Sequence, residues 1–210
     1  MPIYAGAFLI SLLIFVVGVY IGSLIDQSSI GNISADVSSI SEKVASVQLL
    51  LLTEGNSSSF CPVYNSQLGS IDSEIEDVGY RLSYLEDERN VFDNELKKKY
   101  FVLEAESYLL SKKVKTLCGG NESLLINFYS NKNCDRCKDQ GTEVLRARDS
   151  LEADGLKVKL FSFDGEIGSP VAEAFVQQYN VTGYPSVVID DNTFAGFRTS
   201  AELQKIIKGS

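Results

Sequence analysis

The chain has 210 residues, of which 44% are hydrophobic and 22% charged, and its formal net charge is −9 at pH 7. This length accommodates one ordinary domain with additions, or two small domains. The acidic balance argues against nucleic-acid binding, because phosphates require a basic surface that no long part of the chain offers. It disfavours peripheral binding to anionic lipid for the same reason.

The first segment of the chain is apolar and free of charge. Residues 3–25 carry no charged side chain, and as a helix they would extend about 34 Å, enough to cross a bilayer. A cleaved signal peptide would have a basic start, a shorter apolar core and a small-residue cleavage site, and the segment has none of these. We therefore predict a transmembrane anchor at 1–25 that contacts membrane lipid, rather than a cleaved signal or a buried soluble helix.

The side of the membrane is indicated by weaker features. No Lys or Arg precedes Lys43, so the positive-inside rule has nothing to count. Asp26 directly after the span, the short N-terminal tail and the four cysteines favour an extracytoplasmic, oxidising location for the soluble part. Four Asn-x-Ser/Thr sequences are compatible with glycosylation, at Asn32, Asn56, Asn121 and Asn180. We predict a single-pass membrane protein with its body outside the cytoplasm.

Residues 26–60 are predicted to be a helical, Ser-rich linker. Their apolar residues follow one helical stripe with steps of three and four: Val37, Ile40, Val44, Val47 and Leu51. A glycine, a run of serines and a proline within 53–62 then interrupt the pattern.

The region 61–118 is predicted to be helical. Apolar residues recur at steps of three and four across 68–117, and the two glycines at 119–120 follow as a helix stop. Two arrangements fit this pattern. One is an antiparallel α-helical hairpin bent between Arg89 and Asn90, and the other is a straight coiled-coil stalk that needs a second chain.

Two cysteines favour the hairpin. Cys61 precedes the helical region and Cys118 follows it, and their midpoint falls at the proposed bend, so they would meet at the open end. Asn90 or Asp93 would then cap the second helix. We therefore predict a structural disulfide between Cys61 and Cys118, which closes a long loop. A disulfide relay from Cys118 to Cys134, or bonds between the chains of a homodimer, are the alternatives.

Residues 119–210 change character and predict an α/β domain. Apolar and alternating runs indicate strands, and the segments between them indicate helices, in the order βαβαββα. Strands are expected at 124–130, 156–164, 186–190 and 193–197, and helices at 135–153, 170–179 and 200–208.

Cys134 and Cys137 form a C-x-x-C pair where the first strand of this domain gives way to a helix. Helix N-termini present unpaired N–H groups and a positive partial charge, which stabilise a thiolate. The thiolate is the form that attacks a disulfide. Because Cys134 lies at the outer edge of the turn and Cys137 one turn deeper, we predict that Cys134 attacks and that Cys137 resolves the mixed disulfide.

A zinc site and a structural disulfide are the other interpretations of this pair. Zinc needs four ligands, but the chain has no His, and Cys61 and Cys118 lack the spacing of a compact zinc knuckle. We therefore expect no metal and no cofactor. A structural disulfide would leave a non-catalytic, membrane-anchored stalk or interaction module, which is the alternative function.

A proline before the third strand is the second feature that bears on the function of this domain. Pro185 stands directly before the strand at 186–190, where its missing N–H is tolerated and a cis bond fits. The C-x-x-C pair after the first strand and Tyr184-Pro185 before the third resemble the thioredoxin superfamily, and Gly183 extends the likeness to protein disulfide isomerase domains. The resemblance implies that the backbone at Tyr184 and Pro185 binds a substrate peptide. The whole layout is similar to membrane-anchored thioredoxin-like proteins predicted from archaeal genomes.

The chain departs from that superfamily within the motif itself. Asn133 stands where the superfamily usually has Trp before the first cysteine. Asn127 lies nearest to the position at which relatives carry a buried Asp that assists proton transfer. Between the cysteines, Arg136 favours a thiolate and Asp135 opposes it. The resemblance therefore implies a thiol–disulfide oxidoreductase that acts on protein thiols with a separate redox partner, without fixing the direction of electron flow.

The predicted architecture has four parts. A thioredoxin-like α/β domain follows an α-helical hairpin, a linker and one transmembrane helix, with boundaries at 1–25, 26–60, 61–118 and 119–210.

Overall fold

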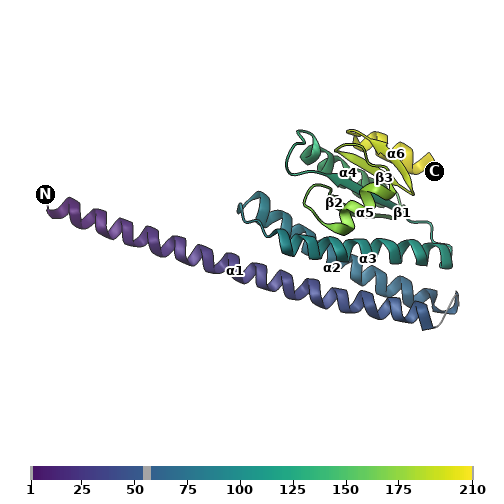
Figure 1. The fold of residues 1–210 in the computed structure, drawn as a ribbon, viewed down its shortest axis with the longest axis horizontal. Coiled ribbons are helices and arrows are strands. Elements are labelled where there is room, and N and C mark those ends of the chain that lie inside the picture. Colours follow the sequence, from purple (N-terminus) through teal and green to yellow (C-terminus); the bar gives the residue numbers. More distant parts are fainter. Residues whose placement is uncertain (1, 54–57, 210) are drawn as a thin grey trace.

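The computed structural model describes residues 2–53 and 58–209. One helix projects far beyond the rest of the molecule and leads into a helical bundle, and a small sheet with its own helices lies along one side of that bundle (Figure 1). The part of the predicted interruption of the helical pattern that falls on 54–57, and with it Asn56, lies outside the described residues.

The projecting helix, α1, spans Pro2–Thr53 without interruption. The large apolar side chains between Tyr4 and Ile25 are exposed, and the helix is long and apolar enough to cross a membrane. This confirms the long apolar N-terminal helix that the sequence predicts. The second half of α1 instead buries one stripe against the bundle: Ile33, Val37, Ile40, Val44 and Val47.

Residues 26–53, predicted as part of a helical, Ser-rich linker, are helical but do not form an independent segment. They continue the apolar segment in one helix and pack against the two helices that follow. Serines are poor helix formers, but most helical stability in a folded protein comes from packing an apolar face, and that face is supplied here.

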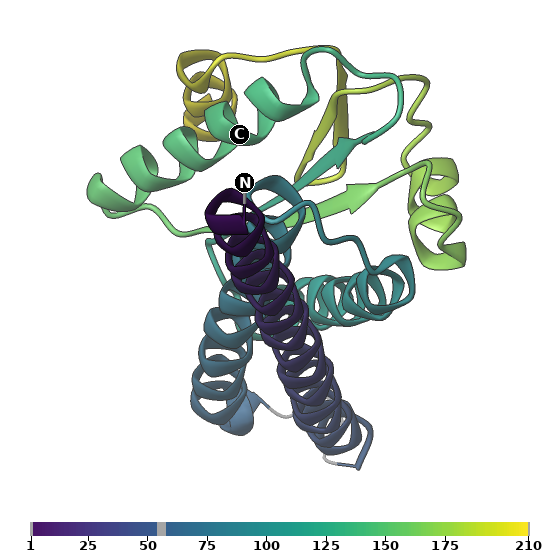
Figure 2. The ribbon, with the colours of Figure 1, turned by 90° about the vertical axis from the view of Figure 1, so that its left-hand side faces the viewer.

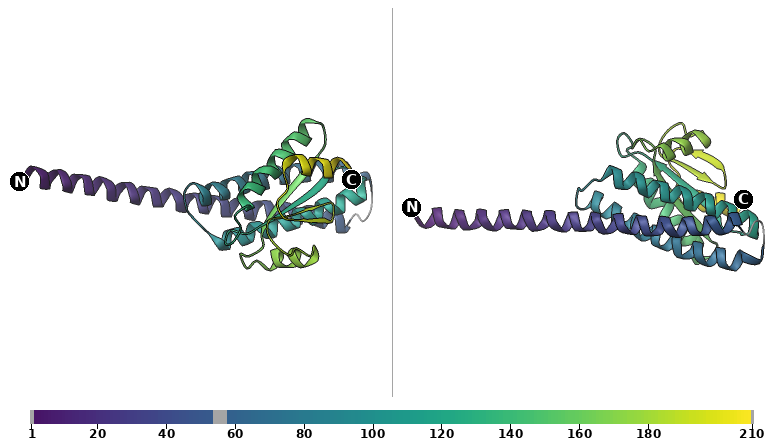
Figure 3. Two further views of the ribbon diagram at one scale, coloured as in Figure 1. Left: turned by 90° about the horizontal axis from the view of Figure 1, so that it is seen from above. Right: turned by 60° about the horizontal axis from the view of Figure 1, so that its bottom comes forward.

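Two more helices complete the bundle, α2 (Cys61–Asp87) after the 3-10 turn η1 (Ser58–Phe60), and α3 (Asn94–Cys118). They lie beside the second half of α1, and each runs antiparallel to the helix before it (Figure 3). The Sγ atoms of Cys61 and Cys118 are bonded at 1.97 Å, which joins the start of α2 to the end of α3.

The break between α2 and α3 has a local cause. The Asp93 side chain accepts a hydrogen bond of 2.9 Å from the Leu96 N–H and so caps α3, and Asn90 adopts a positive φ of 54° in the turn. At the other end, Gly119 has a φ of 68°, which suits a residue without a Cβ. The region 62–117 thus forms two helices rather than one straight helix.

The C-terminal part contains a mixed four-stranded sheet in the order β2-β1-β3-β4. β1 pairs parallel with β2 and antiparallel with β3, and β3 pairs antiparallel with β4. A mixed sheet with helices on its faces fits the α/β class that the sequence predicts. The elements are β1 (Ser123–Tyr129), α4 (Cys137–Ala153), β2 (Val158–Asp164), α5 (Pro170–Gln178), β3 (Ser186–Ile189), β4 (Asn192–Ala195) and α6 (Ser200–Gly209).

The two faces of the sheet are covered by different partners (Figure 2). α4 and α6 cover one face and bury Leu125, Val144, Leu151 and Leu203 in a core of their own. α5 and the bundle helix α3 cover the other face, and there the core of the sheet is continuous with the core of the bundle. The bundle is therefore part of the folded body and not a separate stalk.

α3 contacts the edge strand β2 through aromatic and polar side chains. The Phe101 and Phe163 rings lie 5.6 Å apart, and the Tyr108 ring meets Phe161 edge to face at 5.3 Å. Between these contacts, the Glu104 carboxylate accepts a 2.7 Å hydrogen bond from the Ser162 N–H. That N–H would otherwise be an unpaired donor on the edge of the sheet.

We predict that Cys61 and Cys118 are linked within one chain. Non-reducing digestion of the purified monomer, followed by mass spectrometry, should yield a single peptide pair that contains both residues. The expected loss on replacing both by Ser is about 2–4 kcal/mol in the free energy of unfolding, since the bond closes a long loop. Disulfide-linked dimers joined through Cys61 or Cys118 would contradict the antiparallel arrangement of α2 and α3.

Glu104 gives a second prediction, on pH. Burial raises the pKa of this carboxyl group to about 7, although hydrogen bonds from Tyr100 and Ser162 oppose the rise. The folded protein therefore binds more protons here than the unfolded chain, whose pKa is near 4.5. Between these values the stabilising contribution of Glu104 falls as pH rises, by up to about 3 kcal/mol.

The measurement is urea unfolding in detergent from pH 4 to pH 8, with Glu104→Gln as the matched variant. The amide keeps the size and the acceptor of the carboxyl group but does not titrate. The difference in free energy of unfolding between the two proteins should change across pH 4.5 to 7 and stay flat above. An unchanging difference would mean that Glu104 has the same pKa in both states.

Candidate functional site

The predicted site residues gather at one edge of the sheet. β1 and β2 both end there, and β3 begins there, because Phe128 near the end of β1 pairs with Ser186 at the start of β3. Three connections therefore meet at this edge, at 130–136, 165–169 and 179–185. The C-x-x-C pair lies on the first connection and Tyr184-Pro185 on the third.

The two cysteines differ in exposure. Their Sγ atoms are bonded and their Cα atoms lie 5.5 Å apart. Cys137 is the first residue of α4 and is only 6% exposed, whereas Cys134 in the preceding turn is half-buried. The Ser130 N–H lies 3.4 Å from the Cys137 Sγ, which fixes the inner sulfur beneath the end of β1. An incoming thiol or disulfide can thus reach Cys134 more readily than Cys137.

The residues between the cysteines are held to the side by aromatic and polar contacts. The Arg136 guanidinium stacks on Phe197, with its Cζ 3.8 Å from the ring centre, and its Nε donates to Asp139 at 3.0 Å. Phe197 is positioned in turn by Gln140, a fully buried side chain on α4 that hydrogen-bonds both the N–H and the C=O of Arg198. The guanidinium of Arg136, directly before Cys137, therefore lies against Phe197 and Asp139, although its side chain is 54% exposed.

Pro185 is buried, and the Tyr184-Pro185 peptide bond is cis, as the sequence predicted. The Pro185 C=O accepts from the Gly196 N–H at 2.9 Å, which ties the turn to the end of β4. The Tyr184 ring lies over Gly165, where a Cβ would collide with it. Burial, with the negative charges of Glu166 and Asp164, raises the pKa of Tyr184.

A polar link joins the first two connections. The Ser130 hydroxyl donates to the Glu166 carboxylate, and the Lys132 Nζ donates to the Glu166 C=O at 2.8 Å. The Ser130 Oγ also accepts from the Lys132 N–H at 3.0 Å. Sequence reasoning did not identify Ser130, Glu166, Gln140 or Phe197. A polar residue directly after β1 could have pointed to Ser130, whereas Gly165 separates Glu166 from the end of β2.

Asn127 occupies the interior of β1, on the face covered by α4 and α6. It is 4% exposed, and among the residues described its Oδ1 is one of few buried side-chain atoms without a hydrogen-bond partner. A buried amide oxygen left in this state is costly. Asn cannot carry the proton that an Asp would carry at the same place.

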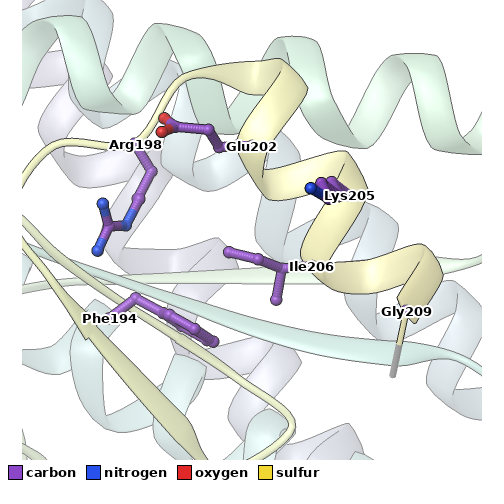
Figure 4. Close-up of a pocket in the computed structure, with 6 residues that line it drawn as sticks. All are labelled: Phe194, Arg198, Glu202, Lys205, Ile206 and Gly209. Carbon is purple, nitrogen blue, oxygen red and sulfur yellow. The ribbon is translucent and has the colours of Figure 1, made fainter.

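Across 2–53 and 58–209, no cluster of three or more His, Cys, Asp or Glu side chains is arranged to hold a metal ion. A shallow depression of ≈ 480 Å³ lies between β4 and α6 (Figure 4), where the side chains of Phe194 and Ile206 point toward each other. It shares no lining residue with the predicted site.

Comparisons with known proteins give only structural likeness. No family model and no curated protein sequence matches the chain. A solved structure of chloroplastic thioredoxin z is similar over 47% of this chain and 87% of its own, with 15% identity and a TM-score of 0.36. The first thioredoxin domain of mouse protein disulfide-isomerase A4 is similar over 47% and 69%, with 18% identity and a TM-score of 0.35.

The unequal exposure of the cysteines predicts unequal reactivity. In fully reduced protein below pH 7, Cys134 should alkylate at least about tenfold faster than Cys137, because it is half-buried just before a helix whereas Cys137 is buried. Timed iodoacetamide labelling with peptide mass spectrometry measures each rate. Cys134→Ser should lose the fast phase and Cys137→Ser should keep it. Four equal, slow rates would indicate a structural pair.

Proposed function

We propose that the chain is a membrane-anchored thiol–disulfide oxidoreductase that exchanges disulfides with protein thiols through Cys134 and Cys137. The observation that carries this proposal is the pairing of a half-buried sulfur with a buried one at the start of α4. Tyr184 and Pro185, at the same sheet edge, supply backbone for binding an extended substrate segment.

The exchange balances with sulfur atoms alone. The Cys134 thiolate attacks one sulfur of a client disulfide, a mixed disulfide forms, and the other client sulfur leaves as a thiolate. The Cys137 thiolate then attacks the Cys134 sulfur and releases the client as a dithiol, while the enzyme pair becomes a disulfide. The reverse sequence oxidises a client dithiol. Neither direction needs a cofactor, but each needs a second redox protein that resets the pair.

The anchor completes the proposal. The exposed apolar side chains between Tyr4 and Ile25 have no partner in the described part of the chain, and lipid would cover them. The disulfides at Cys61–Cys118 and Cys134–Cys137 suit an oxidising compartment, so the body belongs outside the cytoplasm.

A trapping variant tests the exchange. In Cys137→Ser the attacking thiol remains but the resolving thiol is gone, so mixed disulfides with clients should accumulate through Cys134. Membranes from expressing cells, blocked with alkylating agent and run on non-reducing gels, should show high-mass adducts that disappear on reduction.

The control is Cys134→Ser, which keeps a single thiol at the buried position and should trap at least about tenfold less. Equal adduct levels in both variants, or none in either, would favour the non-catalytic stalk or interaction module.

A further inference from the structure

The anchor and the bundle share one helix, so the body cannot turn freely on the membrane. α1 runs from Pro2 to Thr53 with no break, and Asp26 is the first charged residue along it. Sharp helix kinks arise at internal prolines, Gly/Ser pairs, π-bulges or inserted side chains. α1 contains no proline after its first residue, and it continues as a helix through Gly22 and Ser23. The level of every group in the body is therefore set relative to the end of the apolar span.

Ion pairs fix the register of α2 along α1. Lys43 pairs with Glu74 at 2.6 Å and Asp36 pairs with Arg81 at 2.6 Å. The third pair joins Arg89, in the turn after α2, to Asp26 at 2.8 Å. Each step down α1 toward the membrane is matched by a step up α2, as antiparallel helices require. The α2–α3 turn thus lies at the level where the apolar span ends.

The same turn also contacts the cysteine edge of the sheet. Asp87, the last residue of α2, pairs with Lys138 at 2.8 Å, and Lys138 directly follows Cys137. The Asp87–Lys138 pair is exposed, so it shows where the two segments meet but contributes little to stability. A second is buried: the Lys97 Nζ bonds Glu86 at 2.6 Å and lies 5.5 Å from the centre of the Tyr129 ring, at the end of β1.

Figure 1 shows the consequence for the whole molecule. The start of α4 and the α2–α3 turn lie at the end of the body from which α1 projects, and the end that carries the Cys61–Cys118 disulfide lies away from it. Since one continuous core joins α1, α3 and the sheet, the sheet cannot rotate to face elsewhere without losing buried area.

The turn itself carries apolar surface at this level. Phe92 is 62% exposed, although it lies between the Arg89–Asp26 pair and the cap of α3. Aromatic side chains are favoured where a membrane meets water, because the headgroup region accepts both apolar and polar groups. An exposed phenylalanine next to the end of a membrane span is therefore suited to contact lipid.

We propose that the structure holds the Cys134–Cys137 edge at the membrane surface, facing the bilayer, so that its exchange partners are cysteines in the membrane-adjacent segments of other membrane proteins. The partner class rests on the function proposed above. In the exchange, the two thiols of the reduced pair give two electrons to a disulfide in such a segment, and the products are a disulfide at Cys134–Cys137 and two partner thiols.

An insertion in α1 tests the partner class. Eighteen residues of an Ala-rich helical sequence placed between Ile25 and Asp26 add five whole turns, which raises the body about 27 Å and keeps its facing. The same eighteen residues ahead of Met1 serve as the matched control. Each protein is reconstituted in phosphatidylcholine vesicles, reduced, and offered an acylated peptide with a disulfide within three residues of its acyl chain, or the same peptide without acyl chain.

The uninserted protein and the control should reduce the acylated peptide at the same rate, and the raised protein should do so at least about tenfold more slowly. All three should reduce the free peptide equally, which shows that the body is folded and active. Equal rates on the acylated peptide would overturn the membrane-facing proposal and leave the oxidoreductase intact. Failure of all three on both peptides would instead overturn the proposed function.

A fluorescence measurement tests whether the α2–α3 turn lies at the membrane, and it does not depend on enzymatic activity. The chain has no Trp, so Phe92→Trp introduces a single reporter. Leu52→Trp is the matched control. Leu52 is 81% exposed and lies on the same side of the membrane as Phe92, but about 39 Å beyond Asp26 along α1. Lipids brominated near the headgroup should quench the first at least about threefold more than the second. Equal quenching would place the turn away from the bilayer and overturn the proposal.

Discussion

Toward the sheet, α3 presents Phe101 and Tyr108 to β2 and α5, and toward the bundle it presents Tyr100 and Ser107 to α2. The Tyr100 hydroxyl approaches α2 so closely that a Cβ at Gly79 would collide with it. α3 is thus buried on both sides, and it is the element through which the apolar cores of bundle and sheet become one. Without this double packing, the sheet would have one bare face and the bundle would be a thin hairpin.

The polar groups in this interface are as demanding as the apolar ones. Glu104 is buried with its carboxylate against the edge of β2, and Lys97 is buried with Glu86. Removing a charge from water is costly, and breaking one half of a buried pair is more costly than the pair is stabilising. Such contacts specify one docking geometry, because any shift of α3 along β2 would leave the Ser162 N–H unpaired and would remove one of the two hydrogen bonds that Glu104 accepts.

The helices were predictable from their apolar periodicity, and the cysteines and Pro185 from their spacing to strands. The depth to which α3 is buried was not. Glu104, Lys97 and Ser107 look like a solvated face in sequence, and only the packing of α3 against both the sheet and α2 makes them interior. The loop contacts of the site were hidden for a similar reason. Glu166 and Gln140 act on residues 36 and 58 positions away in the chain, and such distant pairings leave no local pattern.

A thiol-exchange site can choose its clients by shape or by position. The depression of ≈ 480 Å³ between β4 and α6 shares no residue with the cysteine edge, and that edge offers backbone and two sulfurs of unequal exposure, which are features that any extended segment can meet. Confinement to a surface raises the effective concentration of partners confined to the same surface. In the proposed exchange, a helix that fixes the level of the sulfurs would supply selectivity that the site itself does not encode, and the continuity of α1 from Pro2 to Thr53 would then matter to client choice as Cys134 does.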